Sequence, residues 1–284
     1  MQNKELKLRV NGIGIIYNRF MNLVIIQARM ASTRLPGKVL LELSPEKTVL
    51  DLLVERVVQA KTVDRIVIAT TKSIKDLEIL EHCKQKGYEV FIGSEDDCLD
   101  RHYQCARVMG ADSISKIPSD VPFIDPKLID KNISLFTKES FDFVSTLHPP
   151  TFPDGMDIET MTFNALRKAW GSAVKSYERE HTTPYIWDNP ENFKIGAIES
   201  DQKYDYFMKY RFTIDYNDDL EFMKQVYKNF IVDDIFFTWQ NLVKFLDNNP
   251  SIYSINRKYL GNNWFGKHID ELNTFDPLKT KEYK

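Results

Sequence analysis

The stretch LVIIQARMASTRLPGK, residues 23–38, joins a short apolar run to a loop with three permanent cations. Residues 23–26 are typical of a buried β-strand. In the loop that follows, Arg29, Arg34 and Lys38 can bind phosphate oxygens, arginine as a planar fork and lysine as a point charge. Unlike an ordinary solvated basic loop, it also contains two hydroxyl side chains, a proline and a glycine. We therefore predict a polyphosphate-binding loop directly after the first core strand.

The composition favours a small-molecule ligand. With 284 residues and 43% apolar content, the chain can bury a large core as one domain, or as one domain with an appendage. Its 38 basic and 41 acidic residues leave a net charge of −3, which gives no overall attraction to nucleic acid or to an anionic membrane. No apolar run reaches membrane-spanning length. We expect neither nucleic acid nor a membrane as a partner.

The three cysteines form no recognisable metal or redox motif. Cys83, Cys98 and Cys105 are odd in number and lack both C-x-x-C and zinc-ligand spacing. We expect reduced thiols in a cytoplasmic protein, without a metal–thiolate site.

Apolar runs of strand length alternate with helical patterns through the first half of the chain. Thr48 and Asp51 resemble a capping pair at the start of the clearest helical pattern. The alternation predicts an α/β fold with three Rossmann-like layers, a mostly parallel central sheet and helices on both faces. Ligands bind such sheets beyond the carboxyl ends of the strands, where the basic loop lies. The expected strands span residues 23–26, 65–71, 89–93, 113–117 and 141–147, and the expected helices span 49–61, 75–86, 95–109 and 126–138.

The pattern is looser in the second half. Residues 148–159, which contain prolines, a glycine and three carboxylates, are expected to be a structured loop. Residues 1–20 are interpreted as an N-terminal extension without an assigned function. Beyond the loop we expect helices over residues 163–173 and 218–230, strands over 193–198 and 210–214, and an amphipathic segment over 236–245.

Two aspartates at expected strand ends, Asp120 and Asp215, are candidates for a metal site. Mg²⁺ prefers few carboxylates together with water and substrate phosphates, and aspartates from two separate strands can supply them. Taken alone, each is more often a turn or helix-cap residue. Asp125, directly before Pro126, is predicted to be the N-cap of the next helix.

Four segments resemble the CMP-sugar cytidylyltransferases, the enzymes that activate sialic acid, Kdo and related acid sugars. Residues 29–38 resemble their R-x-G-S-x-R-L-P-x-K loop, and residues 119–125 resemble their G-D-x-P-x-x-D segment. Residues 93–101 are similar to G-S-x-x-D-V-L-D-R, and residues 211–215 to a later R-x-T-x-D strand. The similarity is greatest to the spore-coat polysaccharide biosynthesis branch. It implies a nucleotidyltransferase fold and a homodimer.

Three positions depart from that branch. Ala31 and Ser119 stand where it has glycine, and Lys116 stands where it often has arginine. If the glycine at position 31 serves a positive φ or a close phosphate approach, the methyl group of alanine costs some of that freedom. Neither the Walker loop nor the dinucleotide-binding G-x-G-x-x-G motif occurs in the chain.

The resemblance assigns roles to individual residues. In that family the aspartates corresponding to Asp120 and Asp215 hold magnesium, so Mg²⁺ is the expected cofactor. The residues expected to act in catalysis are Arg29, Arg34, Lys38 and Asp120. Those expected to bind the nucleotide are Gln27, Ala28, Arg29, Ser32, Lys38, Thr71, Gly93, Ser94 and Arg101. Those expected to contact the sugar are Asp157, Glu159, Arg179 and His181.

The resulting prediction is a magnesium-dependent enzyme that transfers a cytidylyl group from CTP to a sugar or acid sugar for surface polysaccharide or glycan biosynthesis. The nucleotidyltransferase domain would span residues 21–235, with sugar and dimer contacts at about 148–192, and residues 236–284 would form a helical tail that packs on it. The alternatives are another nucleoside triphosphate, a nucleotide-sugar binding protein without chemistry, and a glycosyltransferase. The last is weakened because residues 154–159 lack the D-x-D spacing.

Overall fold

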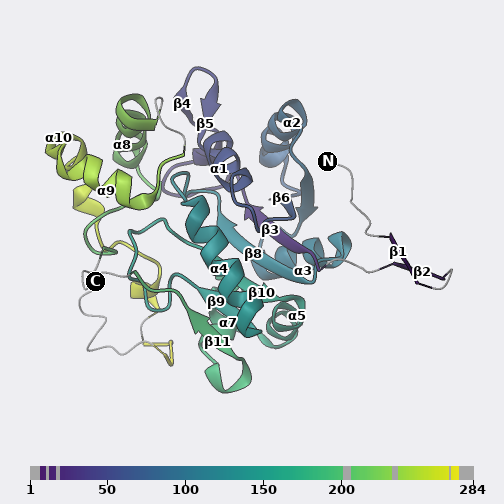
Figure 1. The fold of residues 1–284 in the computed structure, drawn as a ribbon. Helices are drawn as coiled ribbons and strands as arrows, with labels where there is room; N and C mark the ends of the chain where they lie inside the picture. The colour runs from purple at the N-terminus through teal and green to yellow at the C-terminus, as the bar shows by residue number, and fades with distance from the viewer. Residues whose placement is uncertain are drawn as a thin grey trace.

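Seven strands form one central sheet in the order β11-β9-β10-β8-β3-β6-β7 (Figure 1). The computed structural model describes residues 7–10, 13–16, 20–200, 206–231, 236–268 and 270–274. β10 runs antiparallel to both its neighbours, and every other neighbouring pair in this sheet is parallel. The predicted mostly parallel sheet is therefore confirmed. The strands are β3 (Asn22–Gln27), β6 (Arg65–Thr71), β7 (Val90–Gly93), β8 (Ser113–Pro118), β9 (Phe143–Ser145), β10 (Glu159–Thr162) and β11 (Ile195–Ala197).

Helices cover both faces of the sheet, because successive side chains of a buried strand point to opposite sides. In β3, Val24 and Ile26 pack into one apolar cluster, and Leu23 and Ile25 pack into a second. The three predicted layers are confirmed. The first cluster receives α1 (Val49–Val58), α2 (Leu77–Lys86), α4 (Pro126–Glu139), α8 (Asn217–Val226) and α9 (Trp239–Asp247), and the second receives α3 (Cys98–Met109), α5 (Phe163–Ser172), α6 (Ser176–His181) and α7 (Pro184–Trp187).

The order of the strands places a crevice beside β3. The chain runs outward from β3 to β6 and β7, and then returns through α3 to β8 on the other side of β3. Where the direction of strand addition reverses, the loops at the carboxyl ends of the strands separate and leave room for a ligand. The loops at residues 28–37 and 119–125, which follow β3 and β8, lie at this point.

The helix starts follow local capping rules. Thr48 and Asp51 form the predicted capping box of α1, and Asp125 caps α4 by accepting a hydrogen bond from the amide of Lys127. The third helix begins at Cys98, later than expected, because Asp97 is its N-cap. The helix expected over residues 218–230 is α8, which continues as a π-helical turn, Tyr227–Ile231.

One prediction for the second half of the chain is wrong. Residues 210–214 do not form a strand of the sheet, because their backbone pairs with loops: the amide of Asp154 donates to Tyr210, and that of Ile214 donates to Asp120, each at 3.0 Å. Residues 148–158 form a loop as expected, but β10, which begins at Glu159, was not predicted; Glu159 faces Lys116 of the neighbouring strand β8. The short helices α6 and α7 were not predicted.

The ends of the chain lie partly outside the described residues. Within the expected extension, β1 (Lys7–Val10) and β2 (Ile13–Ile16) pair with each other, whereas residues 1–6, 11–12 and 17–19 are not described. The expected domain boundary after residue 235 adjoins residues 232–235, which are also not described. No helix among the described residues is long and apolar enough to cross a membrane.

Arg56 of α1 ties that helix to two distant segments. This fully buried side chain donates from Nε to the carbonyl of Ile124 at 2.9 Å, and from a terminal nitrogen to that of Phe237 at 2.8 Å. Its guanidinium carbon also lies 3.7 Å from the centre of the Phe237 ring. Because Ile124 belongs to the loop after β8, Arg56 connects the core to that loop.

We predict that Arg56→Ala lowers the free energy of unfolding by about 3 kcal/mol, because hydrogen bonds from a charged group contribute about 1.5–3 kcal/mol each and both carbonyls would stay buried. Scanning calorimetry should show a midpoint lower by roughly 5 °C or more. Arg65→Ala is the matched control, since Arg65 pairs with Glu89 at the surface, where an ion pair contributes about 0–1 kcal/mol. An equal fall in both variants would contradict the anchoring role of Arg56.

Candidate functional site

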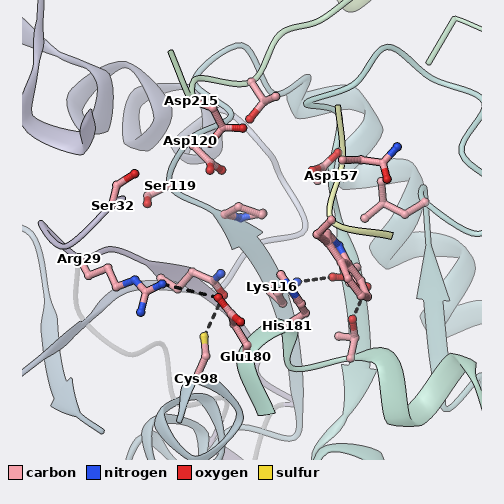
Figure 2. Close-up of a pocket in the computed structure, with 18 of the residues that line it drawn as sticks. Arg29, Ser32, Cys98, Lys116, Ser119, Asp120, Asp157, Glu180, His181 and Asp215 are labelled. Carbon is pink, nitrogen blue, oxygen red and sulfur yellow. Dashed lines mark hydrogen bonds and ion pairs between the residues drawn. The ribbon is translucent and has the colours of Figure 1, made fainter. Parts of the chain in front are cut away.

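A cleft of about 460 Å³ opens at the carboxyl end of the sheet beside β3 and β8. Figure 2 shows its side chains converging from the loops after these two strands, from α6 and from the loop that carries Asp157. The predicted site residues that line the cleft are Gln27, Ala28, Arg29, Ser32, Arg34, Lys38, Arg101, Asp120, Asp157, Glu159, His181 and Asp215. Thr71, Gly93, Ser94 and Arg179 do not line it.

The loop after β3 is closed by its own backbone. The amide of Gly37, at φ +69°, donates to the carbonyl of Met30 at 2.9 Å, and the amide of Met30 donates to Asp76 at 2.7 Å. The Thr71 hydroxyl also donates to Asp76, so Thr71 supports the loop from behind instead of facing the cleft. Ala31 has no positive φ, and glycine's conformational freedom is therefore required at position 37 and not at position 31.

Lys38 lies at the centre of the cleft between two carboxylates. Its Nζ donates to Asp120 at 2.6 Å, to Asp215 at 2.9 Å and to the carbonyl of Ile214 at 2.8 Å. Burial opposes the charged ammonium, but the two carboxylates outweigh it and raise the pKa of Lys38 above its usual value. Arg34 adds a second cation, 2.6 Å from the same oxygen of Asp215.

Arg211 pairs with Asp215 and was not among the predicted site residues. It is buried and contacts three carboxylates, those of Asp154 at 2.9 Å, Asp215 at 2.9 Å and Asp219 at 3.0 Å. The segment that resembles R-x-T-x-D contained the signal, since it begins with this arginine. Gly155, at φ +102°, lets its loop pack closely on the backbone next to Arg211. A Cβ added at this position would lie 2.6 Å from the carbonyl carbon of Phe212.

The two predicted metal ligands, Asp120 and Asp215, both contact Nζ of Lys38. No group of three or more His, Cys, Asp or Glu side chains in the described part of the chain could hold a metal by itself. Asp120 and Asp215 nevertheless each place an oxygen within 3 Å of the same Lys38 nitrogen, which shows that a cation fits between them. Two hard anionic oxygens of this kind suit Mg²⁺ when phosphate and water supply its other ligands.

Arg101, which was predicted to bind the nucleotide, lines the cleft. An added Cβ on Gly93 would lie 2.8 Å from Cγ of Arg101, so the absence of a side chain there lets the arginine pack closely. Arg101 in turn donates to the Ser94 carbonyl at 2.5 Å. Gly93 and Ser94 were predicted to contact the nucleotide, but in the structure they position Arg101, which lines the cleft.

The predicted sugar contacts fall into two groups. Arg179 is directed away from the cleft, because it pairs with Asp97 and donates to the carbonyl of Trp170 at 2.7 Å. Glu159 lines the cleft, but Lys116 at 2.5 Å and Thr183 at 2.5 Å already occupy its two oxygens. Asp157 and His181 line the cleft without such ion pairs among the described residues.

Burial shifts the pKa values of two histidines and two aspartates that line the cleft around Asp157 and His181. It lowers the pKa of His181 to about 3 and that of His148 to about 4, so both imidazoles are neutral at neutral pH. It raises the pKa of Asp154 to about 7 and that of Asp157 well above its usual range, with neighbouring carboxylates adding to the effect on Asp157. The region therefore favours neutral hydrogen-bonding groups.

Several known proteins are similar to this chain over most of its length. A family model described as cytidylyltransferase matches residues 23–241. The spore coat polysaccharide biosynthesis protein SpsF of Bacillus subtilis is 37% identical over 211 residues, which cover 72% of this chain and 86% of SpsF. An uncharacterized protein of Methanocaldococcus jannaschii is 40% identical over 235 residues, covering 82% of this chain and 93% of that protein. A solved cytidylyltransferase structure from Leptospira borgpetersenii has a TM-score of 0.77 and 34% identity, covering 82% of this chain and 97% of that one.

The chain therefore belongs to the cytidylyltransferase family. It is a nucleotidyltransferase, and the fold class predicted from its sequence is the one observed. The glycosyltransferase alternative is set aside.

Cys98, the first residue of α3, also lines the cleft, although no ligand role was predicted for it. Its Sγ lies 3.3 Å from a nitrogen of Arg101 and 3.5 Å from Oε1 of Gln27. Burial favours the neutral thiol, but His102 and Arg101 outweigh it and lower the pKa of Cys98 to about 6. Burial raises the pKa of Cys83 to about 11 and that of Cys105 to about 12.

We predict that iodoacetamide alkylates Cys98 at a rate that rises through pH 6 and levels off at higher pH, because the thiolate is the nucleophile. Mass spectrometry of digested protein should find Cys83 and Cys105 unmodified at neutral pH. Cys98→Ser is the control and should remove the fast reaction. A midpoint near about 8.5, the value of an ordinary thiol, would contradict the assignment.

Proposed function

We propose that the protein transfers a cytidylyl group from CTP to a hydroxyl of a sugar or acid sugar, with Mg²⁺, and releases pyrophosphate. The observation that carries the proposal is Lys38 held between Asp120 and Asp215 beside Arg34, which combines the cations and carboxylates that a metal-bound triphosphate needs. The similarity to SpsF, which is named for spore coat polysaccharide biosynthesis, supports a role in surface polysaccharide or glycan biosynthesis.

In the proposed reaction, the protein contributes mainly position and charge. Arg29, Arg34 and Lys38 neutralise the phosphates that leave as pyrophosphate, and each preorganised contact of this kind contributes on the order of 3 kcal/mol at the transition state. Asp120 and Asp215 would hold Mg²⁺, which supplies further positive charge to the phosphate oxygens. When Mg²⁺ binds, Lys38 would exchange its contacts with Asp120 and Asp215, and Arg34 its contact with Asp215, for contacts with the phosphates.

The two halves of the cleft would then have separate tasks. Gln27, Ala28, Ser32 and Arg101 line the side proposed to bind the nucleotide, and Asp157 and His181 line the side proposed to receive the sugar. The homodimer, with its contacts at about 148–192, and the domain limits at residues 20 and 235 stay predictions.

The choice of nucleotide is tested by incubating the protein and Mg²⁺ with each of the four nucleoside triphosphates and a panel of sugars and acid sugars. We expect pyrophosphate release with CTP that depends on one sugar. Release with UTP, GTP or ATP instead would assign another nucleotidyl transfer to the same site. Binding without release in every combination would contradict the proposed catalysis.

The roles of the central residues are tested by Lys38→Ala and Asp120→Ala. Each should reduce turnover about a hundredfold or more, because each removes a preorganised charge from the triphosphate site. Lys47→Ala is the matched control, since Lys47 pairs with Glu55 outside the cleft. Circular dichroism checks the fold of each variant. Near-normal CTP turnover in both site variants would refute the assignment.

A further inference from the structure

The last described segment crosses the sugar half of the cleft. Residues 256–268 and 270–274, here called the strap, are anchored at both ends. At one end, Asn256 donates to the Arg211 carbonyl at 3.1 Å and to Asp219 at 3.0 Å. At the other, the backbone amides of Asn273 and Thr274 donate to Asp188 at 2.7 and 2.9 Å. Between the anchors, the strap residues that line the cleft are Asn262, Asn263, Trp264, Lys267 and His268.

Trp264 gives this part of the cleft an aromatic wall. Its ring stacks on His181 of α6, with centroids 3.9 Å apart and planes 14° from parallel. Nearby, His148 packs on Trp187 at 4.2 Å, and the rings of Trp187 and Trp264 lie 6.2 Å apart. Because both imidazoles are neutral, the wall combines apolar surface with hydrogen-bonding atoms and carries no charge of its own.

Asp157 supplies a polar group to the same half of the cleft. Its Oδ1 is buried and has no hydrogen-bond partner in the described structure. By contrast, Glu159, two residues further on, has both oxygens occupied by Lys116 and Thr183. A buried acceptor atom without a partner is costly, so a hydrogen-bond donor of a ligand is the group that this oxygen requires.

Two buried cations of this half are paired with carboxylates: Lys116 is bound to Glu159, and Arg211 is bound to three aspartates. Lys267 of the strap also lines the cleft and brings a positive charge to it. At the neutral aromatic wall, recognition depends on shape, apolar contact and hydrogen bonds. The face of a sugar ring presents C–H bonds that pack on the negative face of an aromatic ring, while its hydroxyl groups are donors.

We propose that the strap determines which acceptor is used: one face of the sugar ring packs against Trp264, and a hydroxyl or amide donor of the sugar bonds to Oδ1 of Asp157. The strap lies beyond residues 23–241, the part of the chain that the family model matches. The inference deepens the proposed function and rests on it.

Binding is measured by tryptophan fluorescence, with CMP present and no CTP. The wild type and Trp264→Phe are titrated with N-acetylneuraminic acid, 3-deoxy-manno-octulosonic acid, N-acetylglucosamine and glucose. We expect one of these sugars to change the fluorescence of the wild type and to leave that of Trp264→Phe nearly unchanged. If none of them does so, the inference is overturned.

The role in specificity is then measured by steady-state kinetics with the sugar that binds. Trp264→Ala and Asp157→Asn should each raise KM for the sugar about tenfold, with KM for CTP changed less than about twofold, and Trp264→Phe should recover most of the loss. Trp170→Phe is the matched control, because Trp170 stacks on Tyr103 outside the cleft. An equal rise in KM for CTP would show a structural role and overturn the inference. A sugar that binds at Trp264 but releases no pyrophosphate with CTP counts against the proposed function alone.

Discussion

The ammonium of Lys38, held between the carboxylates of Asp120 and Asp215, is the interaction on which the rest of the site depends. It joins three stretches of chain that are far apart in sequence: the loop after β3, the loop after β8 and the segment before α8. Taking these charges out of water is costly, and only close mutual contact offsets that cost. Two arginines also pair with Asp215: Arg34 contacts its Oδ1 and Arg211 contacts its Oδ2. These contacts together set the position of Asp215 relative to Lys38, Arg34 and Arg211.

A few buried hydrogen bonds connect the core to the loops of the site. Arg56 links α1 to the loop after β8, and Asp125 at the end of that loop accepts a hydrogen bond from the amide of Trp239 at 2.9 Å. The apolar layers on each face of the sheet therefore determine where the cleft residues lie. Lys116 and Glu159, which face each other on the neighbouring strands β8 and β10, form another such buried contact in the lining of the cleft.

Several residues that were predicted to contact the nucleotide lie outside the cleft and support residues or loops that line it. Thr71 holds Asp76, which holds the backbone of the loop after β3. Gly93 leaves space for Arg101, and Ser94 accepts its hydrogen bond. Such supporting residues have the same local spacing as residues that line the cleft, because both follow the same strand ends. Only the three-dimensional structure separates the two groups, and it also places Arg179, which pairs with Asp97, outside the lining of the cleft.

The sequence by itself determined what depends on near neighbours. Apolar runs of strand length placed β3, β6, β7 and β8, and the capping signals at Thr48 and Asp125 placed two helix starts. The spacing of Arg34 and Lys38 located the loop that lines the cleft. Only the tertiary structure decided which charges pair, because the partners of Lys38 lie 82 and 177 positions away. It also decided that residues 210–214 bond to loops, that β10 inserts antiparallel between β8 and β9, and that Trp264 stacks on His181. Local patterns record burial and backbone preference, whereas the choice among many possible long-range partners is made only when the layers pack.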